Sequence, residues 1–459
     1  MREKETTLEA HTSTPAGAIV HDVVQTADQL TTLTAPVRVL CVDMDDPLPD
    51  LEEQDANATS YNGVLVYIQR GARVVGQAYI NLSQPTANDE LARQVAAIDS
   101  RGVDSEPMPD AQTLPRISVV IPTTLDRLES LERCLQSLLR QDYRAFEVVI
   151  VDNRPDGTPG REDIYRKLRI DPRFHVVSEA TIGISAARNR GVEQAASDII
   201  AFTDDDVEVA PQWLRSLAVR FAMEPETECV TGLVLPAELE TQAQVWFERS
   251  GGKIDQRYER TTYGRADYES RFAVSARDAH GNVMGPVVPI YRAKFGMGAN
   301  MTFRKAALRA MGGFDHALGA GVRTRGGEDI AMISQLLYSG GQLTFDPSVV
   351  VHHYHRRDLE ALRSQMRGYG VGYTAALTAL IVRDPRHLIG LLGMVVRAVG
   401  LLSSRSRQRV AGDFPSSLAR IEFWGLVLGP TTYIRSRLTD RRRPGAGVRI
   451  PAPAVRSNG

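Results

Sequence analysis

The sequence of 459 residues lacks several features that mark specialised classes of protein. It has only three cysteines, Cys41, Cys134 and Cys229, whose odd number and wide spacing give neither a disulfide framework nor a zinc cluster. The formal net charge is only -2, which argues against a nucleic-acid binder that works through bulk charge. The first residues lack the apolar stretch of a secretory signal. We therefore expect a protein of the reducing cytoplasm that binds no nucleic acid.

The composition is otherwise that of a globular protein. Apolar residues (43%) and charged residues (24%) have ordinary abundances, so a disordered or fibrous chain is excluded. At roughly 100–200 residues per domain, the length predicts two or three units. We expect a small β-rich unit with a linker at 1–112, an α/β domain at 113–360 and an Arg-rich apolar helical region at 361–459. The strands expected in the first unit are 37–44, 63–70 and 72–82, the last two forming a hairpin at Gly71.

The small net charge hides an uneven distribution. Residues 356–459 contain 18 Arg and no Lys against 6 acidic residues, a charge of +12, whereas the rest of the chain carries -14. The apolar segments within this basic region are 371–382, 388–396 and 421–434, each shorter than the ~18–20 residues needed to span a bilayer.

Apolar segments bordered by arginines and by aromatics such as Trp424 and Tyr433 are typical of helices that lie on an anionic membrane surface. That interpretation predicts peripheral attachment to the inner face of the cell membrane. The alternative is a helical cap packed on the acidic α/β domain, and the two can hold together.

The central region has the alternating pattern of an α/β domain. Its apolar runs predict strands buried on both faces, as in a largely parallel sheet, at 116–124, 146–153, 174–179 and 198–202. Two helices are predicted between them, one at 183–197 and one whose inward face carries Leu128, Leu131, Leu135 and Leu138. In such a domain, functional groups lie at the carboxyl ends of the strands.

Three consecutive carboxylates, Asp204, Asp205 and Asp206, directly follow the strand predicted at 198–202. In an extended chain Asp204 and Asp206 point to the same side, because side chains alternate. Hard oxygen ligands suit Mg²⁺ or Mn²⁺, which completes its shell with substrate phosphates. A solvated acidic turn is the alternative, but the position after a buried strand favours a metal site.

Other polar residues lie where strands and helices begin or end. Asp152 ends the strand at 146–153, where it can accept hydrogen bonds from a base or ribose, or else cap a helix. Arg188 and Asn189 lie on the helix before the acidic cluster and can reach phosphate or ribose. A surface ion pair is the alternative for Arg188.

Two further groups lie toward the end of the α/β domain. Glu328 and Asp329 follow a glycine-rich stretch and begin a helix, where capping by the macrodipole is the alternative to catalysis. His352, His353 and His355 follow an apolar strand at 343–351. Histidine is a common metal ligand, so one of the three can complete the metal site, whereas a packed core position is the alternative.

Six segments in order make the pattern recognisable: VVIPTTLDR, VIVDNRPDG, GISAARNRGVEQAASDIIAFTDDD, GANMTFRKAALRAMGGFD, GGEDIAM and VVVHHYHRRD. Together they resemble the family 2 glycosyltransferases of bacterial type, which have the GT-A fold. The resemblance covers roughly residues 116–360 and leaves the N-terminal unit unmatched. It implies an inverting, metal-dependent transferase that moves a sugar from a nucleotide-diphosphate sugar, most commonly a UDP-sugar, to a hydroxyl acceptor. Glycan, lipid-linked and natural-product acceptors stay open.

The resemblance also implies roles for particular residues. Those assigned to the nucleotide-sugar are Thr123, Arg127, Asp152, Arg188, Asn189, Asp204 and Asp205. Those assigned to the Mn²⁺ or Mg²⁺ ion are Asp204, Asp206 and His353, with His352 and His355 as competing histidines. Asp329 would be the general base, with Glu328 beside it.

Two other functions are weighed against this one. A sugar-phosphate nucleotidyltransferase should carry a glycine-rich basic loop after the first strand, where this chain has PTTLDR. A non-catalytic protein that binds sugar nucleotides or glycans would not need Asp206 or Asp329, yet both are present.

Overall fold

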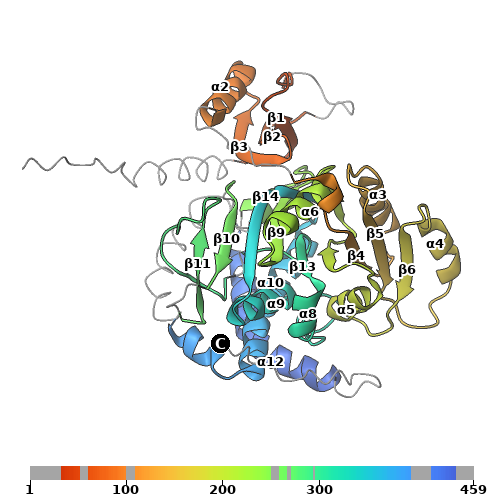
Figure 1. Cartoon of the computed structure of the whole chain (residues 1–459). Coiled ribbons are helices and arrows are strands. Elements are labelled where there is room, and N and C mark those ends of the chain that lie inside the picture. The colour runs from red at the N-terminus through yellow and green to blue at the C-terminus, as the bar shows by residue number, and fades with distance from the viewer. Residues whose placement is uncertain are drawn as a thin grey trace, which may run out of the picture.

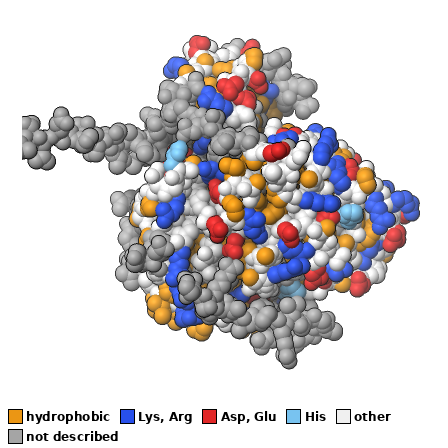
Figure 2. Space-filling model, in the orientation of Figure 1, with side chains coloured by type: hydrophobic (Ala, Val, Ile, Leu, Met, Phe, Trp, Pro, Cys, Tyr) orange, Lys and Arg blue, Asp and Glu red, His pale blue; other side chains and the backbone are white. Residues whose placement is uncertain are grey.

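The computed structural model describes residues 33–51, 60–99, 109–249, 258–265, 270–292, 295–393 and 415–440. The body is a large sheet with helices on both faces; a small β unit lies at one end and the C-terminal helices at the other (Figure 1). On the face shown in Figure 2, acidic and basic side chains are interspersed over the α/β body.

The main sheet is mixed, with eleven strands in the described chain. Four neighbouring strands pair in parallel in the order β6-β5-β4-β7: β4 (Ile117–Thr123), β5 (Phe146–Asp152), β6 (Phe174–Ser178) and β7 (Ile199–Phe202). The order continues from β7 through β13 (Met301–Arg304), β9 (Thr227–Pro236), β14 (Gln342–His353), β10 (Thr261–Gly264), β11 (Ala273–Arg277) and β12 (Val288–Pro289). The short β8 (Val207–Val209) pairs with β14. The four strands predicted for the parallel part are confirmed.

Helices cover the two faces because each buried strand alternates its side chains between them. Val119 of β4 packs with α3 and α6, whereas Val120 packs with the opposite layer. The first layer holds α3 (Leu128–Leu139) and α6 (Trp213–Met223), and the second α5 (Ile184–Gln194), α8 (Lys305–Ala310) and α9 (Glu328–Tyr338). The smaller helices are α4 (Arg161–Leu168) and α7 (Gln242–Arg249). The predicted leucine face of α3 is correct except for Leu128, which is exposed because it lies at the helix start.

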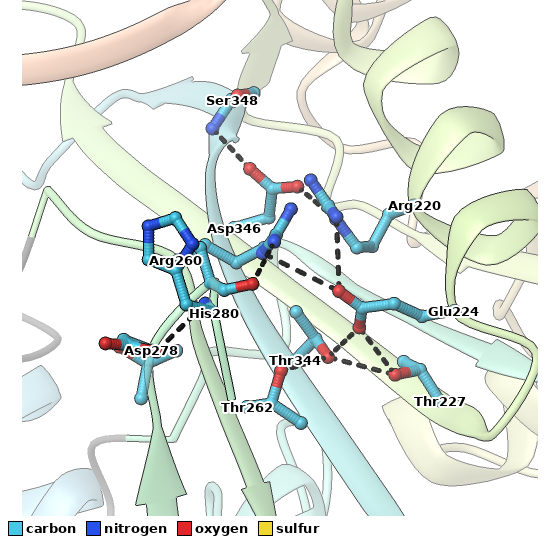
Figure 3. Close-up of polar contacts among 12 residues, drawn as sticks. Arg220, Glu224, Thr227, Arg260, Thr262, Asp278, His280, Thr344, Asp346 and Ser348 are labelled. Carbon is cyan, nitrogen blue, oxygen red and sulfur yellow. Dashed lines mark hydrogen bonds and ion pairs between the residues drawn. The ribbon is translucent and has the colours of Figure 1, made fainter. Parts of the chain in front are cut away.

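A buried polar network ties α6 to the strands β9 and β14 (Figure 3). Arg220 donates through Nε to Asp346 (2.7 Å) and through Nη1 to Glu224 (3.1 Å). The hydroxyls of Thr227 and Thr344 donate to the other Glu224 oxygen at 2.9 and 2.6 Å. The buried charges therefore have partners, as burial requires.

The N-terminal unit is a three-stranded sheet with one helix. β1 (Val37–Asp43) pairs in parallel with β2 (Gly63–Arg70), which forms an antiparallel hairpin with β3 (Arg73–Asn81), and α2 (Ala87–Asp99) covers the sheet. The predicted strands and hairpin are confirmed, and α2 is an element that was not predicted. The unit contacts the body through apolar side chains such as Leu65 and Tyr67, which join its core, and through bonds such as that from the Val37 amide to the Leu239 carbonyl (2.9 Å).

Two long helices form the C-terminal region, α10 (Leu359–Arg383) and α12 (Ser416–Asp440). They approach closely at glycines: a Cβ added to Gly370 would lie 2.2 Å from the Glu422 carbonyl oxygen. Tyr433, predicted at a membrane interface, is instead buried against the α/β body. Its hydroxyl donates to Asp315 there (2.8 Å). The helical cap is therefore observed for these two helices, and the end of the predicted segment 388–396 lies outside the described residues.

The outer side of α12 is apolar. Its exposed large hydrophobic side chains are Phe423, Trp424, Val427, Leu428, Ile434 and Leu438. No helix in the described parts of the chain combines the length and the apolar content needed to cross a bilayer.

Candidate functional site

The candidate site lies at the carboxyl edge of the parallel strands. Thr123 ends β4, and the acidic cluster follows β7 after Thr203. The pairing of β8 with β14 places Val207 opposite His353, which brings the histidine beside the cluster. The amide of Tyr354 donates to the Asp206 carbonyl (3.0 Å) and fixes this arrangement.

Asp204, Asp206 and His353 converge as a possible metal site. One ligand atom from each lies within 4.8 Å of the others. Residues 205–206 form a turn and are not extended, yet Asp204 and Asp206 converge while Asp205 points elsewhere. Two carboxylates and one imidazole form a donor set that suits a divalent cation with open positions for phosphate oxygens.

Asp205 and Asp206 share one arginine. Arg127 pairs with both carboxylates, and the Thr123 hydroxyl donates to Asp205 (2.7 Å). Burial raises the pKa of Asp205 to about 6, although Arg127 and Thr123 act in the opposite direction. Burial also raises the pKa of Asp206, but His353 and the nearby arginines lower it more, so its pKa lies below the usual range. Asp206 thus stays ionised, as a metal ligand must.

A chain of hydrogen bonds runs from the site to a buried glutamate. Nε2 of His353 lies 3.3 Å from Asp206, while its Nδ1 lies 3.2 Å from Nδ1 of His355. Nε2 of His355 lies 3.0 Å from the Glu248 carboxylate, which accepts. The network therefore assigns the His355 proton to Nε2, so that its Nδ1 accepts from His353. In its neutral form His353 then keeps the Nε2 lone pair toward the site.

The acidic pair Glu328 and Asp329 begins α9, and the buried Arg188 joins this pair to the aspartate cluster. Nη1 of Arg188 donates to Glu328 (2.7 Å), and Nη2 donates to the Gly298 carbonyl (3.2 Å) and to Asp204 (3.3 Å). Asp329 accepts from the Gly298 amide (3.0 Å). Burial raises the pKa of Glu328 and of Asp329 by more than Arg188 lowers it. Arg188 is 1% exposed, so it connects the carboxylates from beneath the site.

Two predicted nucleotide residues have their polar atoms engaged within the protein. Asp152 is fully buried and accepts from Arg154 Nε and from the Tyr165 hydroxyl, both at 2.9 Å. Asn189 bonds to the backbone of Phe314 through its amide nitrogen (2.9 Å) and oxygen (2.8 Å).

The histidines left open by sequence lie differently. His352 is not part of the group that converges with the carboxylates, since alternation along β14 turns it away from His353. His355 contacts His353 and not the carboxylates of the cluster. Sequence reasoning missed Glu248, since a single glutamate on a helix carries no motif, and missed Arg356, which lies 3.7 Å from Asp206.

Comparison with known proteins gives a consistent assignment. Residues 118–284 match the family described as Glycosyl transferase family 2. A pre-mycofactocin glycosyltransferase of Mycobacterium tuberculosis is 27% identical over 302 residues, which are 65% of this chain and 54% of that protein. A glucosyl-dolichyl phosphate glucuronosyltransferase of Haloferax volcanii is 30% identical over 127 residues, 26% of this chain and 39% of that protein. The chain thus spans about half or less of these curated relatives.

Among solved structures, the mannosyltransferase PcManGT from Pyrobaculum calidifontis, in complex with GDP-Man and Mn²⁺, has 17% identity and a TM-score of 0.41. That match covers 77% of this chain and 95% of the other. The family match and the mixed sheet with helices on both faces confirm the predicted α/β fold of the GT-A class.

Proposed function

Because residues 118–284 belong to glycosyl transferase family 2, we propose that this protein is an inverting glycosyltransferase. It moves a sugar from a nucleotide-diphosphate sugar to a hydroxyl acceptor, and UDP-sugars are the donors to test first. One observation carries the proposal: the carboxylates Asp204 and Asp329 lie on the same buried arginine network, formed by Arg188 and the Gly298 backbone. The proposed metal ligand Asp204 and the proposed general base Asp329 are thereby held in a fixed relation to each other.

The donor would lie at the strand edge. Asp204, Asp206 and His353 would hold Mn²⁺ or Mg²⁺. When bound, the cation would offset the negative charge that grows on the diphosphate leaving group. The remaining residues proposed for the nucleotide-sugar are Thr123, Arg127, Asp152, Arg188, Asn189 and Asp205, of which Arg188 acts by positioning Asp204 and Glu328.

Asp329 would accept the proton of the acceptor hydroxyl as the new bond forms. Its raised pKa, caused by burial, makes it a stronger base than an exposed aspartate. Glu328 is tied to Arg188 at 2.7 Å, which leaves it less free to take a proton. A single displacement of this kind inverts the anomeric carbon.

The C-terminal region would hold the enzyme against an anionic membrane on the cytoplasmic side. The exposed apolar side chains of α12 support this contact, because apolar residues next to arginines favour the membrane interface. The cap and the membrane contact use opposite sides of the helix, so both hold together.

Donor turnover tests the proposal. We expect full-length protein to be stabilised against heat by a UDP-sugar only when Mn²⁺ or Mg²⁺ is present, since specific binding shifts the unfolding equilibrium. Slow hydrolysis of that donor should follow the same metal requirement.

Asp206→Asn should remove both effects, and it should lower the melting temperature of the free protein somewhat, because it weakens the ion pairs of Asp206 with Arg127 and His353. Asp163→Asn, an exposed aspartate on α4, is the matched control and should behave like the wild type. Release of pyrophosphate from a nucleoside triphosphate and a sugar 1-phosphate would point to a nucleotidyltransferase instead. Binding without any turnover would point to a non-catalytic protein.

A further inference from the structure

A second polar hollow lies apart from the carboxylate site. It is a cavity of about 560 Å³ between the loop that precedes α9 and the helices α10 and α12. Arginines from three segments line it: Arg323 and Arg325 from the loop, Arg367 from α10 and Arg435 from α12. None of the described lining residues is Asp or Glu.

Three of these arginines are unpaired within the described chain. Arg325 donates to the Ser364 hydroxyl (3.1 Å), but no hydrogen bond or ion pair with another described residue holds the side chain of Arg323, Arg367 or Arg435. Some other arginines of the same region are paired with carboxylates. Arg357, for example, contacts both Glu238 and Glu240. The cavity is therefore a concentration of uncompensated positive charge, which a bound anion would neutralise.

The loop that carries two of these arginines is held under backbone strain. Arg325 has a φ of +59°, which is uncommon for a residue other than glycine. The following Gly326 packs on α10, where a Cβ added to Gly372 would lie 2.7 Å from its carbonyl carbon. A bond from the Gly319 amide to the Gly326 carbonyl (3.2 Å) closes the loop. Arg325 lines the cavity from this loop, just before the helix that begins with Glu328.

One wall of the cavity continues into an apolar surface. Leu428 lines the cavity and also belongs to the exposed apolar side of α12, with Trp424 one turn before it and Val427 next to it. A ligand with an anionic group in the cavity could therefore extend an apolar part along α12. Guanidinium groups favour phosphate oxygens, because their parallel N–H donors match two oxygens at once.

We propose that the arginine cavity binds the phosphate or diphosphate group of a ligand. The shared chemistry is the phosphate, carried either by a lipid headgroup or by a water-soluble phosphorylated molecule. That this ligand is the sugar acceptor rests on the proposed function; the binding itself does not.

The test compares two charge-matched double variants. Arg367→Gln with Arg435→Gln removes two cavity arginines, whereas Arg363→Gln with Arg420→Gln removes two exposed arginines of the same helices that lie outside the cavity. Calorimetry with pyrophosphate in EDTA examines the soluble source. Co-sedimentation with phosphatidylcholine vesicles containing phosphatidic acid examines the lipid source.

We expect the cavity variant to lose about tenfold in affinity per arginine for at least one probe, as for charge-assisted hydrogen bonds, and the control to bind like the wild type. Weaker binding of pyrophosphate alone by the cavity variant than by the control assigns a soluble ligand, and weaker binding of vesicles alone assigns a lipid. Equal binding by both variants, or no binding of either probe by the wild type, overturns the proposal.

Two readouts keep the result interpretable. Arg435→Gln alone serves if the double variant fails to fold, and it should still weaken binding by about tenfold. Hydrolysis of the sugar-nucleotide with Mn²⁺ should be unchanged in the cavity variant, because these arginines lie outside the carboxylate site. If the wild type does not hydrolyse the sugar-nucleotide, the proposed function is contradicted, whereas the comparison of phosphate binding between the variants stays valid.

Discussion

Two arginines of this protein, Arg220 and Arg188, are both buried but differ in the charge balance around them. The group around Arg220 pairs two arginines, Arg220 and Arg260, with two carboxylates, Glu224 and Asp346. Arg188 contacts two carboxylates by itself, Glu328 and Asp204. It also adjoins a third, Asp329, through Gly298.

The carboxyl pKa values follow this difference. Burial raises the pKa of Asp346, but Arg220 and hydrogen bonds lower it more, so its pKa lies below the ordinary value. Burial raises the pKa of Glu328 and Asp329, and there the single arginine does not reverse the shift. A balanced network stabilises the fold, whereas an excess of buried carboxylates stabilises only once a proton, a cation or a substrate arrives.

The largest effect should come from the unbalanced group. Asp329→Asn should cut turnover by roughly 10²–10⁴, the range for a positioned general base, with little change in donor affinity. Glu328→Gln should reduce turnover less and should leave the melting temperature unchanged or raised, because it removes one buried carboxylate charge and keeps an acceptor oxygen for Arg188. Steady-state kinetics with calorimetric melting would separate the two, and the reverse order of kinetic effects would exchange their roles.

Arg220→Met breaks the balanced group and should act on stability. Removing one partner of a buried ion pair costs about 3–5 kcal/mol, so we expect that loss in the free energy of unfolding by urea, with KM for the donor unchanged in the folded protein.

Asp346 has a depressed folded-state pKa, so its contribution to the free energy of unfolding is present above the unfolded pKa of ~3.9 and is lost as the pH falls below it. The stability gap between wild type and Asp346→Asn should therefore narrow in acid. A variant that keeps its stability but loses turnover would contradict the comparison.

Substitutions of Glu248 test whether this buried residue orients the proposed metal ligand His353 through His355. Glu248→Leu removes the acceptor that fixes the proton of His355, and we expect Mn²⁺ affinity with UDP present to fall by about 10–100-fold. Glu248→Gln keeps an acceptor oxygen and should lose less, and Glu193→Gln, an exposed glutamate on α5, should change nothing. Electron paramagnetic resonance of free Mn²⁺ measures the affinity directly. Equal affinities for all three variants would exclude the histidine chain as a positioning device.

The smallest effect concerns the outer side of α12. Trp424→Ala should weaken sedimentation with anionic vesicles several-fold, since part of an apolar side chain worth ~1.5–3 kcal/mol on full burial is removed. Ile170→Ala, an exposed apolar residue just before β6, is the control. The binding should decrease as salt screens the arginines. Full-length wild-type protein that stays in the supernatant at low salt would leave only the helical cap.

Much of the fold could be predicted because its strands and helices have local signals. Apolar runs predicted β4 to β7, and a cluster of aspartates after a buried strand pointed to the edge where the site lies. The site was predictable only in outline. Asp152 and Asn189 have suitable side chains, but their hydrogen bonds go to Arg154, Tyr165 and Phe314.

The α/β body and the residue types at its carboxyl edge were predictable from local patterns, because periodicity and strand ends are set by neighbouring residues. Which groups meet in the site became visible only in the folded chain. His355 and Glu248 are 107 positions apart, and Arg188 and Glu328 are 140 positions apart. The arginine cavity likewise joins residues from 323 to 435. Such contacts depend on how the whole chain packs, and no local pattern records them.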